Sequence, residues 1–408
     1  MTTTSFPKSK ISVLLLESIH QEAVKAFKKE QFQVESLSGA LDADALKKKI
    51  QKAHVVGIRS KTQLTADVLS AGERLLAVGA FCIGTNQIDL KGAADLALPV
   101  FNAPFSNTRS VAELIISHCI SLLRNIPEKN QAAHEGKWLK TAEGSHEVRG
   151  KTLGIVGYGH IGSQVSVLAE SMGMNVVYYD ILDKLALGNA KPAASFDKLL
   201  AMSDIVTLHV PATPVTAGMM SKKKIALMKD GAYLINYSRG NVVDIDALAA
   251  ELGSGRLAGA AIDVFPEEPK VKGEEFKSPL QGMPNVILTP HIGGSTLEAQ
   301  ENIGREVSQK LIKFINNGST TSAVNVPEVE LPMHEGRHRI LHFHKNIPGV
   351  LQAVNSLFAE KGANILGQHL MTNPEIGYLV MDVSKDLNKS MLADLRKIPG
   401  TIKTRILY

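Results

Sequence analysis

Short apolar runs alternate with longer amphipathic segments along most of the chain. A short apolar run between polar turns is typical of a buried strand, whereas apolar residues three and four apart are typical of a helix. We expect strands at 11–16, 54–58, 75–78, 99–101, 153–156, 175–179, 205–211, 232–236, 259–264 and 286–288. We expect helices at 20–29, 111–124, 161–172, 223–228 and 247–252, with a further strand and helix ending at Lys49. This alternation predicts doubly wound parallel sheets of the α/β class, with residues 10–100 as a small domain of their own.

The pattern changes near Gly318. The stretch 318–336 carries two prolines and little helical period, which predicts a linker. Beyond it we expect strands at 340–343, 364–371, 376–383 and 402–407, and helices at 348–361 and 388–397. The order β-α-β-β-α-β predicts a ferredoxin-like domain.

A glycine-rich turn follows the expected strand at 153–156. Gly157, Gly159 and Gly162 have G-x-G-x-x-G spacing, and a helical segment and a second strand come next. Such glycines permit a tight turn and close backbone approach, and the helix N-terminus behind them faces a pyrophosphate. The glycine spacing alone is a weak signal, but the elements around it supply the context of a dinucleotide site.

Asp180 stands at the end of the second strand of this unit. Its carboxylate can accept hydrogen bonds from the ribose hydroxyls of adenosine, and its charge repels a 2′-phosphate. The expected cofactor is therefore NAD rather than NADP.

Three later strands are each followed by a turn that carries an ionisable residue, first Arg239, then Glu268 and last His291. The carboxyl ends of parallel strands share one sheet edge, so these turns should lie with the glycine loop. Arg239 can hold a carboxylate through two hydrogen bonds, and His291 titrates near neutral pH and can take a proton from an alcohol. Glu268 can orient the imidazole and favour its protonated form. Taken singly, each has a structural or solvent-exposed alternative; in this order they predict a nicotinamide-dependent site.

Two cations, Arg59 and Lys61, follow the expected strand at 54–58. Ligands of open parallel sheets collect beyond the carboxyl ends of strands, so these side chains are placed to bind an anion. A solvated turn is the alternative interpretation.

Composition narrows the function classes further. A chain of 408 residues with 44% hydrophobic residues exceeds one ordinary domain and has enough apolar residues for a sizeable core. The net charge of +5, from 45 basic and 40 acidic residues, is too mixed to indicate nucleic acid. Two cysteines, Cys82 and Cys119, cannot form a disulfide framework, and both lie among apolar residues, as buried thiols do. The N-terminus lacks an apolar signal core, and the run at 111–123 is too short to span a bilayer. We expect a cytoplasmic protein without a metal site, a membrane partner or a nucleic-acid partner.

These motifs together resemble those of the D-isomer-specific 2-hydroxyacid dehydrogenase family. The resemblance covers essentially the whole chain and is carried by Gly-Tyr-Gly-His-Ile-Gly at 157–162, Asn-Tyr-Ser-Arg-Gly at 236–240, Asp-Val-Phe-Pro-Glu-Glu-Pro at 263–269, Thr-Pro-His-Ile-Gly-Gly-Ser-Thr at 289–296 and the loop 101–110. It implies that Arg239, Glu268 and His291 are the catalytic residues. It implies cofactor contacts at Gly157, Gly159, His160, Ile161, Gly162, Asp180, Tyr237, Ser238, Arg239, Asp263, His291, Gly293 and Gly294.

The members of the family that the chain resembles most oxidise D-3-phosphoglycerate to 3-phosphohydroxypyruvate with NAD, the first step of L-serine synthesis. On that basis Arg59, Lys61, Asn107 and Lys140 fall where the anionic ends of the substrate are held. Two positions depart from the family pattern. Lys61 stands where an arginine is expected, so a point charge replaces a planar fork. Tyr237 stands where a smaller residue is usual.

The resemblance also implies domain boundaries that the linear pattern does not give. Residues 1–107 and 292–335 would form a discontinuous, flavodoxin-like substrate domain. A Rossmann-type NAD domain, 108–291, would be inserted into it, and 336–408 would be an ACT domain that senses an amino acid.

The implied effector is L-serine, bound between two ACT domains of a homotetramer. His344, Asn346 and Asn364 match the positions that bind it. From residue chemistry alone, the two asparagines are only polar groups at loop ends. Linker glycines and Gly293-Gly294 are the expected hinges.

Two alternatives stay open at this point. One is an enzyme of the same family that acts on an unphosphorylated 2-hydroxy acid, which Arg59, Lys61 and the tail disfavour. The other is a dehydrogenase fold used as a nucleotide-sensing corepressor, which the presence of Arg239, Glu268 and His291 disfavours. Detectable turnover of a panel of 2-hydroxy acids separates them.

Overall fold

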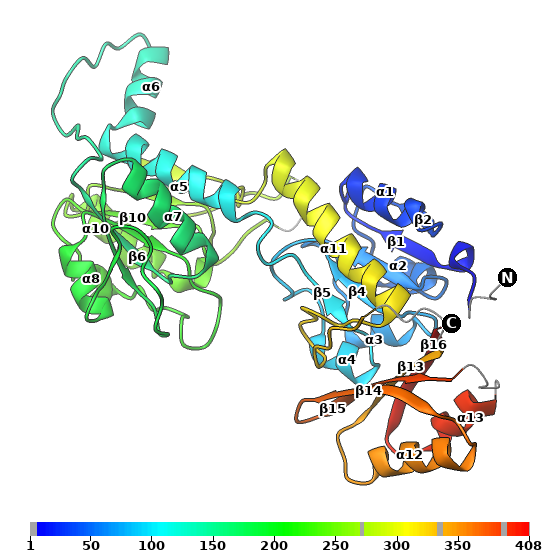
Figure 1. The fold of residues 1–408 in the computed structure, drawn as a ribbon. Helices are drawn as coiled ribbons and strands as arrows, with labels where there is room; N and C mark the ends of the chain where they lie inside the picture. Colours follow the sequence, from blue (N-terminus) through cyan, green and yellow to red (C-terminus); the bar gives the residue numbers. More distant parts are fainter. Residues whose placement is uncertain (1–5, 270–272, 333–337, 385–389, 408) are drawn as a thin grey trace. The chain divides into compact units, whose positions relative to one another are not determined.

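The computed structural model describes residues 6–269, 273–332, 338–384 and 390–407 (Figure 1). Its contacts divide the chain into two compact units, Met1–Ser106 with Gln300–Tyr408, and Asn107–Ala299. The first unit is therefore discontinuous in sequence, and the second is inserted into it. The contacts assign the C-terminal residues to the first unit, so the separate domain expected at 336–408 stays a prediction.

The first unit contains a five-stranded parallel sheet in the order β2-β1-β3-β4-β5. The order 2-1-3-4-5 is that of flavodoxin-like sheets, which confirms the expected class. Parallel neighbours need crossover connections, and the amphipathic segments between the strands provide them as helices. The elements are η1 (Lys8–Lys10), β1 (Ser12–Leu15), α1 (Gln21–Lys29), β2 (Gln33–Ser36), α2 (Ala43–Ile50), β3 (Val55–Ile58), α3 (Ala66–Ser70), β4 (Ala77–Ala80), α4 (Leu90–Asp95) and β5 (Val100–Phe101).

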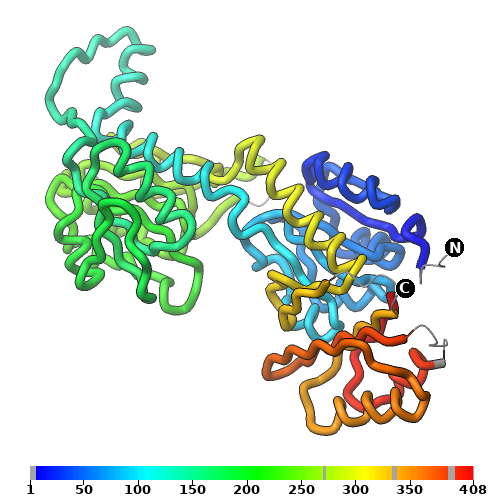
Figure 2. Tube along the Cα trace, in the orientation of Figure 1, coloured from blue at the N-terminus to red at the C-terminus, as the bar shows by residue number. Residues whose placement is uncertain are grey.

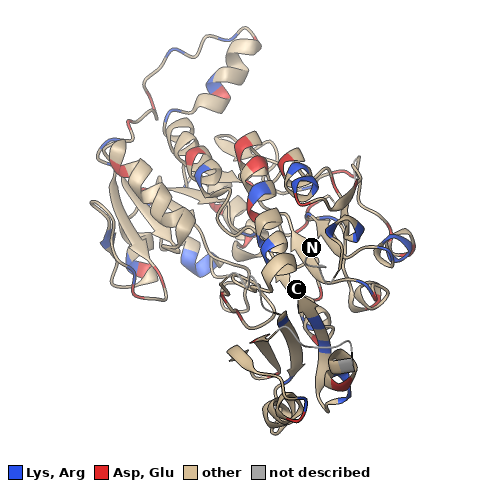
Figure 3. Cartoon of the chain, turned by 45° about the vertical axis from the view of Figure 1, so that its right-hand side comes forward, with Lys and Arg blue, Asp and Glu red and all other residues tan. Residues whose placement is uncertain are grey.

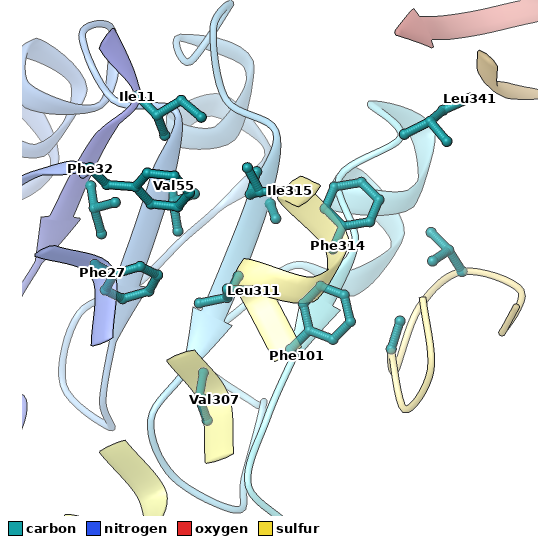
Figure 4. Packing of buried hydrophobic residues seen from close by; sticks show 14 of the residues in the cluster. Ile11, Phe27, Phe32, Val55, Phe101, Val307, Leu311, Phe314, Ile315 and Leu341 are labelled. Carbon is teal, nitrogen blue, oxygen red and sulfur yellow. The ribbon is translucent and has the colours of Figure 1, made fainter. Parts of the chain in front are cut away.

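A helix of 21 residues, α11 (Leu297–Asn317), packs on this sheet although it lies far from the strands in sequence. Figure 2 traces it in yellow beside the blue N-terminal elements, and Gly304 lies against α1. Its buried apolar residues recur every third or fourth position, namely Ala299, Ile303, Val307, Leu311 and Phe314. Figure 4 shows Leu311 and Phe314 in the core beside Phe101, whose ring centroid lies 6.0 Å from that of Phe314. Burial of one such side chain contributes about 1.5–3 kcal/mol, so α11 is an integral part of the first unit.

The segment 318–332 is not the linker that its prolines and weak helical period predicted. Its apolar side chains are buried in the core of the first unit, namely Val326, Val329 and Leu331. The Thr320 hydroxyl donates to the Pro327 carbonyl (2.7 Å) and accepts from the Val329 N–H (2.9 Å). These hydrogen bonds satisfy polar groups that the loop buries, which a low helical period does not reveal. Gly336, at the far end of the expected linker, lies outside the described residues.

Residues 338–384 and 390–407 contain a four-stranded antiparallel sheet in the order β14-β15-β13-β16, and the predicted order β-α-β-β-α-β is confirmed. The elements are β13 (His338–Lys345), α12 (Val350–Glu360), β14 (Ile365–Thr372), β15 (Ile376–Val383), α13 (Ser390–Lys397) and β16 (Thr401–Leu407). One face of the sheet packs with α12 and α13. The other joins the core of the first unit through Leu341, Phe343, Tyr378 and Val380.

A buried ion pair fixes the ACT-like sheet to the end of α11. The Arg339 guanidinium donates two hydrogen bonds to the Asp382 carboxylate (2.6 and 2.7 Å) and one to the Asn317 carbonyl (3.0 Å). Paired charges with their remaining donors satisfied can be buried, whereas a lone charge cannot. The sheet and the remainder of the first unit are therefore held together by specific polar contacts as well as by apolar packing.

The second unit is built on a parallel sheet in the order β12-β11-β10-β9-β6-β7-β8. The strand order reverses at β6, as in Rossmann-type sheets, where the cofactor lies at the carboxyl edge beside the reversal. The strands are β6 (Thr152–Val156), β7 (Asn175–Tyr179), β8 (Lys191–Pro192), β9 (Ile205–Leu208), β10 (Tyr233–Asn236), β11 (Gly259–Ile262) and β12 (Val286–Leu288). The helices are α5 (Thr108–Leu123), α6 (Ile126–His134), α7 (His160–Ser171), α8 (Phe196–Met202), α9 (Lys222–Ile225), η2 (Gly240–Val242) and α10 (Ile245–Gly253).

Charges of both signs are spread over helices and loops (Figure 3), in keeping with the mixed composition. No helix within the described ranges has the length and the apolar character needed to cross a membrane. Cys119 is buried, and burial raises the pKa of its thiol to about 12, as expected for an inert cysteine. Cys82 is partly exposed, so the expectation of burial is wrong for that thiol.

Candidate active site

The turns that carry Arg239, Glu268 and His291 lie at one edge of the second unit's sheet. They follow β10, β11 and β12, which are parallel neighbours; Asn236 pairs with Ile262 and Ile262 with Leu288. Because paired residues at the ends of parallel strands share one edge, each turn begins next to the other two. The glycine loop that follows β6 leaves the same edge.

Glu268 and His291 form a hydrogen-bonded pair. His291 Nδ1 lies 2.9 Å from Glu268 Oε2, and the Phe265 N–H donates to the other carboxylate oxygen (3.1 Å). The hydrogen bond with Glu268 raises the pKa of His291, against the effect of burial. Burial alone would raise the pKa of Glu268, but the bond to His291 and the nearby charges lower it. An ionised Glu268 therefore accepts from Nδ1–H, which leaves Nε2 as the nitrogen that can exchange a proton with a ligand.

The backbone of His291 is held in an uncommon conformation. Its φ is +54°, in the left-handed region that non-glycine residues rarely adopt. Asp263, only 1% exposed, holds the turn: its carboxylate accepts from the Ile292 and Gly293 N–H groups (2.8 Å each), and its carbonyl accepts from the His291 N–H (2.9 Å). Strained residues persist where surrounding contacts over-determine them, and here those contacts fix the direction of the imidazole.

Arg239 is presented by a turn that Asn236 organises. The Asn236 amide oxygen accepts from the N–H (3.1 Å) and the hydroxyl (2.8 Å) of Ser238, and its NH₂ group donates to the Arg239 carbonyl (3.0 Å). A Cβ at Gly240 would lie 2.0 Å from the Phe265 carbonyl, so only glycine allows the two turns to pack this closely. The Arg239 charge lowers the pKa values of both Glu268 and His291. The Arg239 guanidinium is thus near enough to the His291–Glu268 pair to influence both of its members.

The residues of the glycine loop fit a dinucleotide. Gly157 has a φ of +91°, and a Cβ there would lie 2.4 Å from the His209 carbonyl. Gly159, in contrast, has no heavy atom within 4 Å of its Cβ position, which leaves space for a ligand to approach the backbone. Gly159 is also the N-cap of α7 and makes no side-chain cap, so the first N–H groups of the helix remain for a pyrophosphate.

Asp180 is fixed next to that loop. One carboxylate oxygen accepts from the Tyr158 N–H (2.8 Å) and the other from the Leu182 N–H (2.9 Å). The carboxylate is thus bonded to Tyr158, the residue that follows Gly157. This is where the adenosine ribose would lie, next to the pyrophosphate.

Asn107 lies with the His291 turn, whereas Lys140 does not. Asn107 precedes the first residue of α5, and its side-chain amide occupies the place where a Cβ of Gly294 would be, 2.1 Å away. Lys140 is exposed in the loop after α6, and Figure 1 shows α6 and this loop standing off from the other end of α5. A helix of this length spans about 24 Å. Within one chain, the structure therefore does not bring Lys140 to the other candidate residues of the second unit.

In the first unit, Arg59 and Lys61 lie in a loop whose backbone is shaped by a buried carboxylate. Glu17 accepts from the N–H groups of Arg59 (3.2 Å), Lys61 (3.0 Å) and Thr62 (2.9 Å). The Glu17 carboxylate is thus bonded to backbone N–H groups. The Arg59 guanidinium makes a long hydrogen bond to the Glu17 carbonyl (3.5 Å), and Lys61 is exposed, so both cations could still bind an anion. Sequence reasoning missed Glu17, although an acid directly after a run of three leucines at a strand end was a signal.

The three effector candidates are distributed over the ACT-like sheet. Asn346 donates to the Asn373 carbonyl (2.8 Å), just beyond the end of β14, whereas Asn364 directly precedes the start of β14. The two asparagines therefore lie at opposite ends of one strand. His344 is buried, and its Nε2 has no hydrogen-bond partner among the described residues.

Tyr237 and Asp263, both expected at cofactor positions, are buried. The Tyr237 hydroxyl is engaged by His118 and Thr289, and Asp263 by Thr289 and the His291 turn. Neither His118 nor Thr289 was a candidate from the sequence, because a polar residue on an apolar helix face or at a strand end has no distinctive spacing.

Comparison with known proteins agrees with this geometry. A family model described as the NAD binding domain of D-isomer specific 2-hydroxyacid dehydrogenase matches residues 116–293, and an AHAS small subunit-like ACT domain model matches 340–403. The chain is 56% identical to D-3-phosphoglycerate dehydrogenase of Escherichia coli (strain K12), over 100% of both chains. It is 52% identical to the Dictyostelium discoideum enzyme of that name, over 100% of this chain and 99% of the relative.

A solved structure of D-lactate dehydrogenase from Aquifex aeolicus, complexed with NAD and lactic acid, is similar with a TM-score of 0.65 and 29% identity. It covers 75% of this chain and 96% of that one. The full-length identity, the family models and the geometry of the sheet edge agree: the chain belongs to the D-3-phosphoglycerate dehydrogenases of the D-isomer specific 2-hydroxyacid dehydrogenase family.

Proposed function

We propose that the chain oxidises D-3-phosphoglycerate to 3-phosphohydroxypyruvate with NAD, the first step of L-serine synthesis. The observation that carries this proposal is the His291–Glu268 pair beside Arg239, at the sheet edge from which the glycine loop also leaves. The names of the relatives supply the substrate, and the site supplies the chemistry. A corepressor would have no use for a strained, hydrogen-bonded histidine of this kind.

The proton is handled by His291. Its Nδ1–H donates to Glu268, so neutral Nε2 accepts the proton of the C2 hydroxyl as the alcohol becomes a ketone. The imidazolium that forms is stabilised by the Glu268 carboxylate, whose pKa is held below its usual value. Arg239 binds the substrate carboxylate with two donors and so orients C2. When bound, NAD would supply the acceptor for the hydride that leaves C2.

The second unit already orders the groups that would hold NAD. The α7 N-terminus and the loop at Gly157 and Gly159 would hold the pyrophosphate, and Asp180 the adenosine ribose. In the first unit, Arg59 and Lys61 would bind the phosphate of the substrate, with their loop kept in shape by Glu17.

Removing the charge of Arg59 should discriminate between phosphorylated and unphosphorylated substrates. A hydrogen bond to a charged group is worth about 1.5–3 kcal/mol, so Arg59→Gln should lower kcat/KM for D-3-phosphoglycerate by about 10- to 100-fold. For D-glycerate, which lacks the phosphate, kcat/KM should hardly change. NADH formation at 340 nm measures both, with Lys28→Gln on α1 as a control. An equal loss for both substrates would place Arg59 on the carboxylate or in the scaffold. Turnover of D-glycerate but not of D-3-phosphoglycerate by the unmodified enzyme would contradict the proposed substrate.

Neutralising Asp180 should relax the preference for NAD. Asp180→Asn keeps one of the two oxygens that accept from the Tyr158 and Leu182 N–H groups, and it removes the charge that repels a 2′-phosphate. We expect the ratio of kcat/KM for NAD to that for NADP to fall by about 10- to 100-fold. Steady-state kinetics with each cofactor measure this ratio, and Asp183→Asn, an exposed neighbour, is the control. An unchanged ratio would mean that Asp180 does not face the ribose.

The proposal includes a second copy of the chain and L-serine as effector. β14 is an edge strand of the ACT-like sheet, with Asn364 before its first residue and Asn346 bonded to Asn373 beyond its last. Antiparallel pairing of β14 with the same strand of another copy would bring Asn364 of one chain to Asn346 of the other. Amide groups, and the buried Nε2 of His344 that has no partner among the described residues, suit the carboxylate, ammonium and hydroxyl of serine.

A further inference from the structure

Two buried polar side chains in the second unit meet in the interior below the active site. Tyr237 is 6% exposed and His118 is 8% exposed, and they come from the end of β10 and from α5. The Tyr237 hydroxyl lies 2.5 Å from His118 Nδ1 and 3.2 Å from the Thr289 hydroxyl. The Thr289 hydroxyl in turn donates to Asp263 at 2.6 Å. These four side chains thus form one hydrogen-bonded network that ends at the Asp263 carboxylate.

The number of hydroxyl hydrogens decides which group donates in each of these hydrogen bonds. The single hydrogen of Thr289 goes to Asp263, so Thr289 can only accept from Tyr237. The single hydrogen of Tyr237 then goes to Thr289, and Tyr237 accepts from His118, whose Nδ1 carries the hydrogen. Burial raises the pKa of Tyr237 above its usual value, so the phenol keeps its proton. Burial lowers the pKa of His118, which leaves a neutral imidazole protonated on Nδ1.

The hydrogen-bonded network ends at Asp263, the residue that holds the His291 turn. Asp263 accepts from the Ile292 and Gly293 N–H groups and, through its carbonyl, from the strained His291. The Tyr237 ring packs against the same turn, because a Cβ at Gly293 would lie 3.0 Å from Tyr237 Cδ1. Tyr237 therefore touches the turn with its ring and supports it with its hydroxyl.

We propose that Tyr237 and His118 are positioning residues that hold the His291 turn through Thr289 and Asp263, and so keep the His291 imidazole aligned with Glu268. Neither side chain contacts the reacting atoms in this scheme. This inference rests on the proposed role of His291 as the base. It assigns a use to the tyrosine that departs from the family pattern and to a histidine on an otherwise apolar helix face.

Tyr237→Phe tests the hydroxyl alone, because the ring and its packing on Gly293 are kept. Misalignment of a reacting group by a fraction of an ångström costs about 10-fold, so kcat should fall by that order, with the KM values for NAD and D-3-phosphoglycerate almost unchanged. The acid limb of the kcat/KM profile should move to lower pH, because a weaker bond to Glu268 raises the pKa of His291 less. Tyr233→Phe is the matched control, since Tyr233 lies four residues earlier, at the start of β10, in the same core cluster.

A second readout does not depend on turnover. Diethylpyrocarbonate modifies neutral imidazoles, and mass spectrometry of the peptide that contains His291 gives its rate at pH 6. We expect His291 in Tyr237→Phe to react about 2- to 5-fold faster than in the unmodified enzyme or in Tyr233→Phe, since more of the imidazole is neutral. An unchanged rate together with an unchanged pH profile would overturn the proposal, even if thermal stability falls.

The partner residue supplies a rescue test. His118→Asn keeps a donor close to the position of Nδ1, whereas His118→Leu removes it. We expect the leucine variant to reproduce the kcat loss and the faster modification of His291, and the asparagine variant to recover most of both. Equal behaviour of the two variants would contradict the donor role. If the unmodified enzyme failed to oxidise D-3-phosphoglycerate, the proposed function would fail, but the modification rates would still decide whether Tyr237 and His118 control His291.

Discussion

His291→Asn should lower kcat for D-3-phosphoglycerate oxidation by about 10²–10⁴-fold, the usual contribution of general acid–base catalysis. Asparagine is the informative replacement, because His291 has a φ of +54° and asparagine tolerates the left-handed region better than alanine does. Its amide can also donate to Glu268, so the turn should keep its shape while the proton acceptor is lost. NADH binding, followed by protein fluorescence, should be almost unchanged.

The pH profile distinguishes loss of the base from damage to the site. Oxidation needs neutral Nε2, and the bond to Glu268 raises the pKa of His291 above its ordinary 6.5. In the unmodified enzyme kcat/KM should therefore rise with pH through a value above 6.5 and level off beyond it. This limb should disappear in His291→Asn and persist in His134→Asn, which alters an exposed histidine at the end of α6. Near-normal turnover of the asparagine variant would remove His291 from the mechanism.

The catalytic residues were predictable because each follows a strand of one parallel sheet. A strand end fixes the place of the next residues, so spacing along the sequence translates into nearness at the carboxyl edge. Arg239, Glu268 and His291 obey this rule, as do the glycine loop and Asp180. The rule does not predict side chains that contact the site's turns from the interior of the unit, such as one on a helix that packs on the sheet. His118 and Tyr237 are separated by 119 positions and meet only after α5 has packed on the sheet.

Two features of the first unit show where pattern reasoning was incomplete and where it failed. The buried positions of α11 have a clear helical period, from Ala299 through Ile303 and Val307 to Leu311. This helix could therefore be predicted from the sequence, although it was not. The structure of the segment 318–332 could not be predicted from such a pattern. Its buried serine and threonine look like solvent-exposed loop residues until their hydrogen-bond partners within the loop are known.

The burial pattern of β13 and β15 indicates that the ACT-like sheet packs against another part of the first unit. Every residue of β15 is buried, and β13 is buried over six of its eight residues. Strands covered on only one face alternate, so continuous burial means that both faces are covered. The structure identifies the second cover as the core that contains α11. An effector that binds the sheet therefore acts on an element fixed to the unit that carries Arg59.

L-serine inhibition should be abolished by changing one exposed asparagine. The Asn364 side chain is exposed, so Asn364→Ala removes a ligand group without disturbing the core. Serine can inhibit only if it binds one arrangement of the enzyme more tightly than another, and loss of a ligand removes that difference. We expect the serine concentration for half-inhibition to rise by at least about 100-fold, while uninhibited kcat and KM stay almost the same. Point variants are better suited than removal of the module, since Leu341, Phe343 and Tyr378 belong to the core of the first unit.

Asn346→Ala should give the same loss of inhibition from the other end of β14. Its amide donates to the Asn373 carbonyl, so this variant also loses one local hydrogen bond, worth about 1 kcal/mol, and its thermal stability must be recorded. Gln352→Ala, which removes an exposed amide from α12, is the control and should be inhibited normally. Calorimetry of serine with each full-length variant separates lost binding from lost coupling. If serine binds the unmodified chain but both asparagine variants bind it equally well, the effector site lies elsewhere. If serine does not bind the unmodified chain at all, serine is not its effector, and pairing through β14 would be left to serve assembly alone.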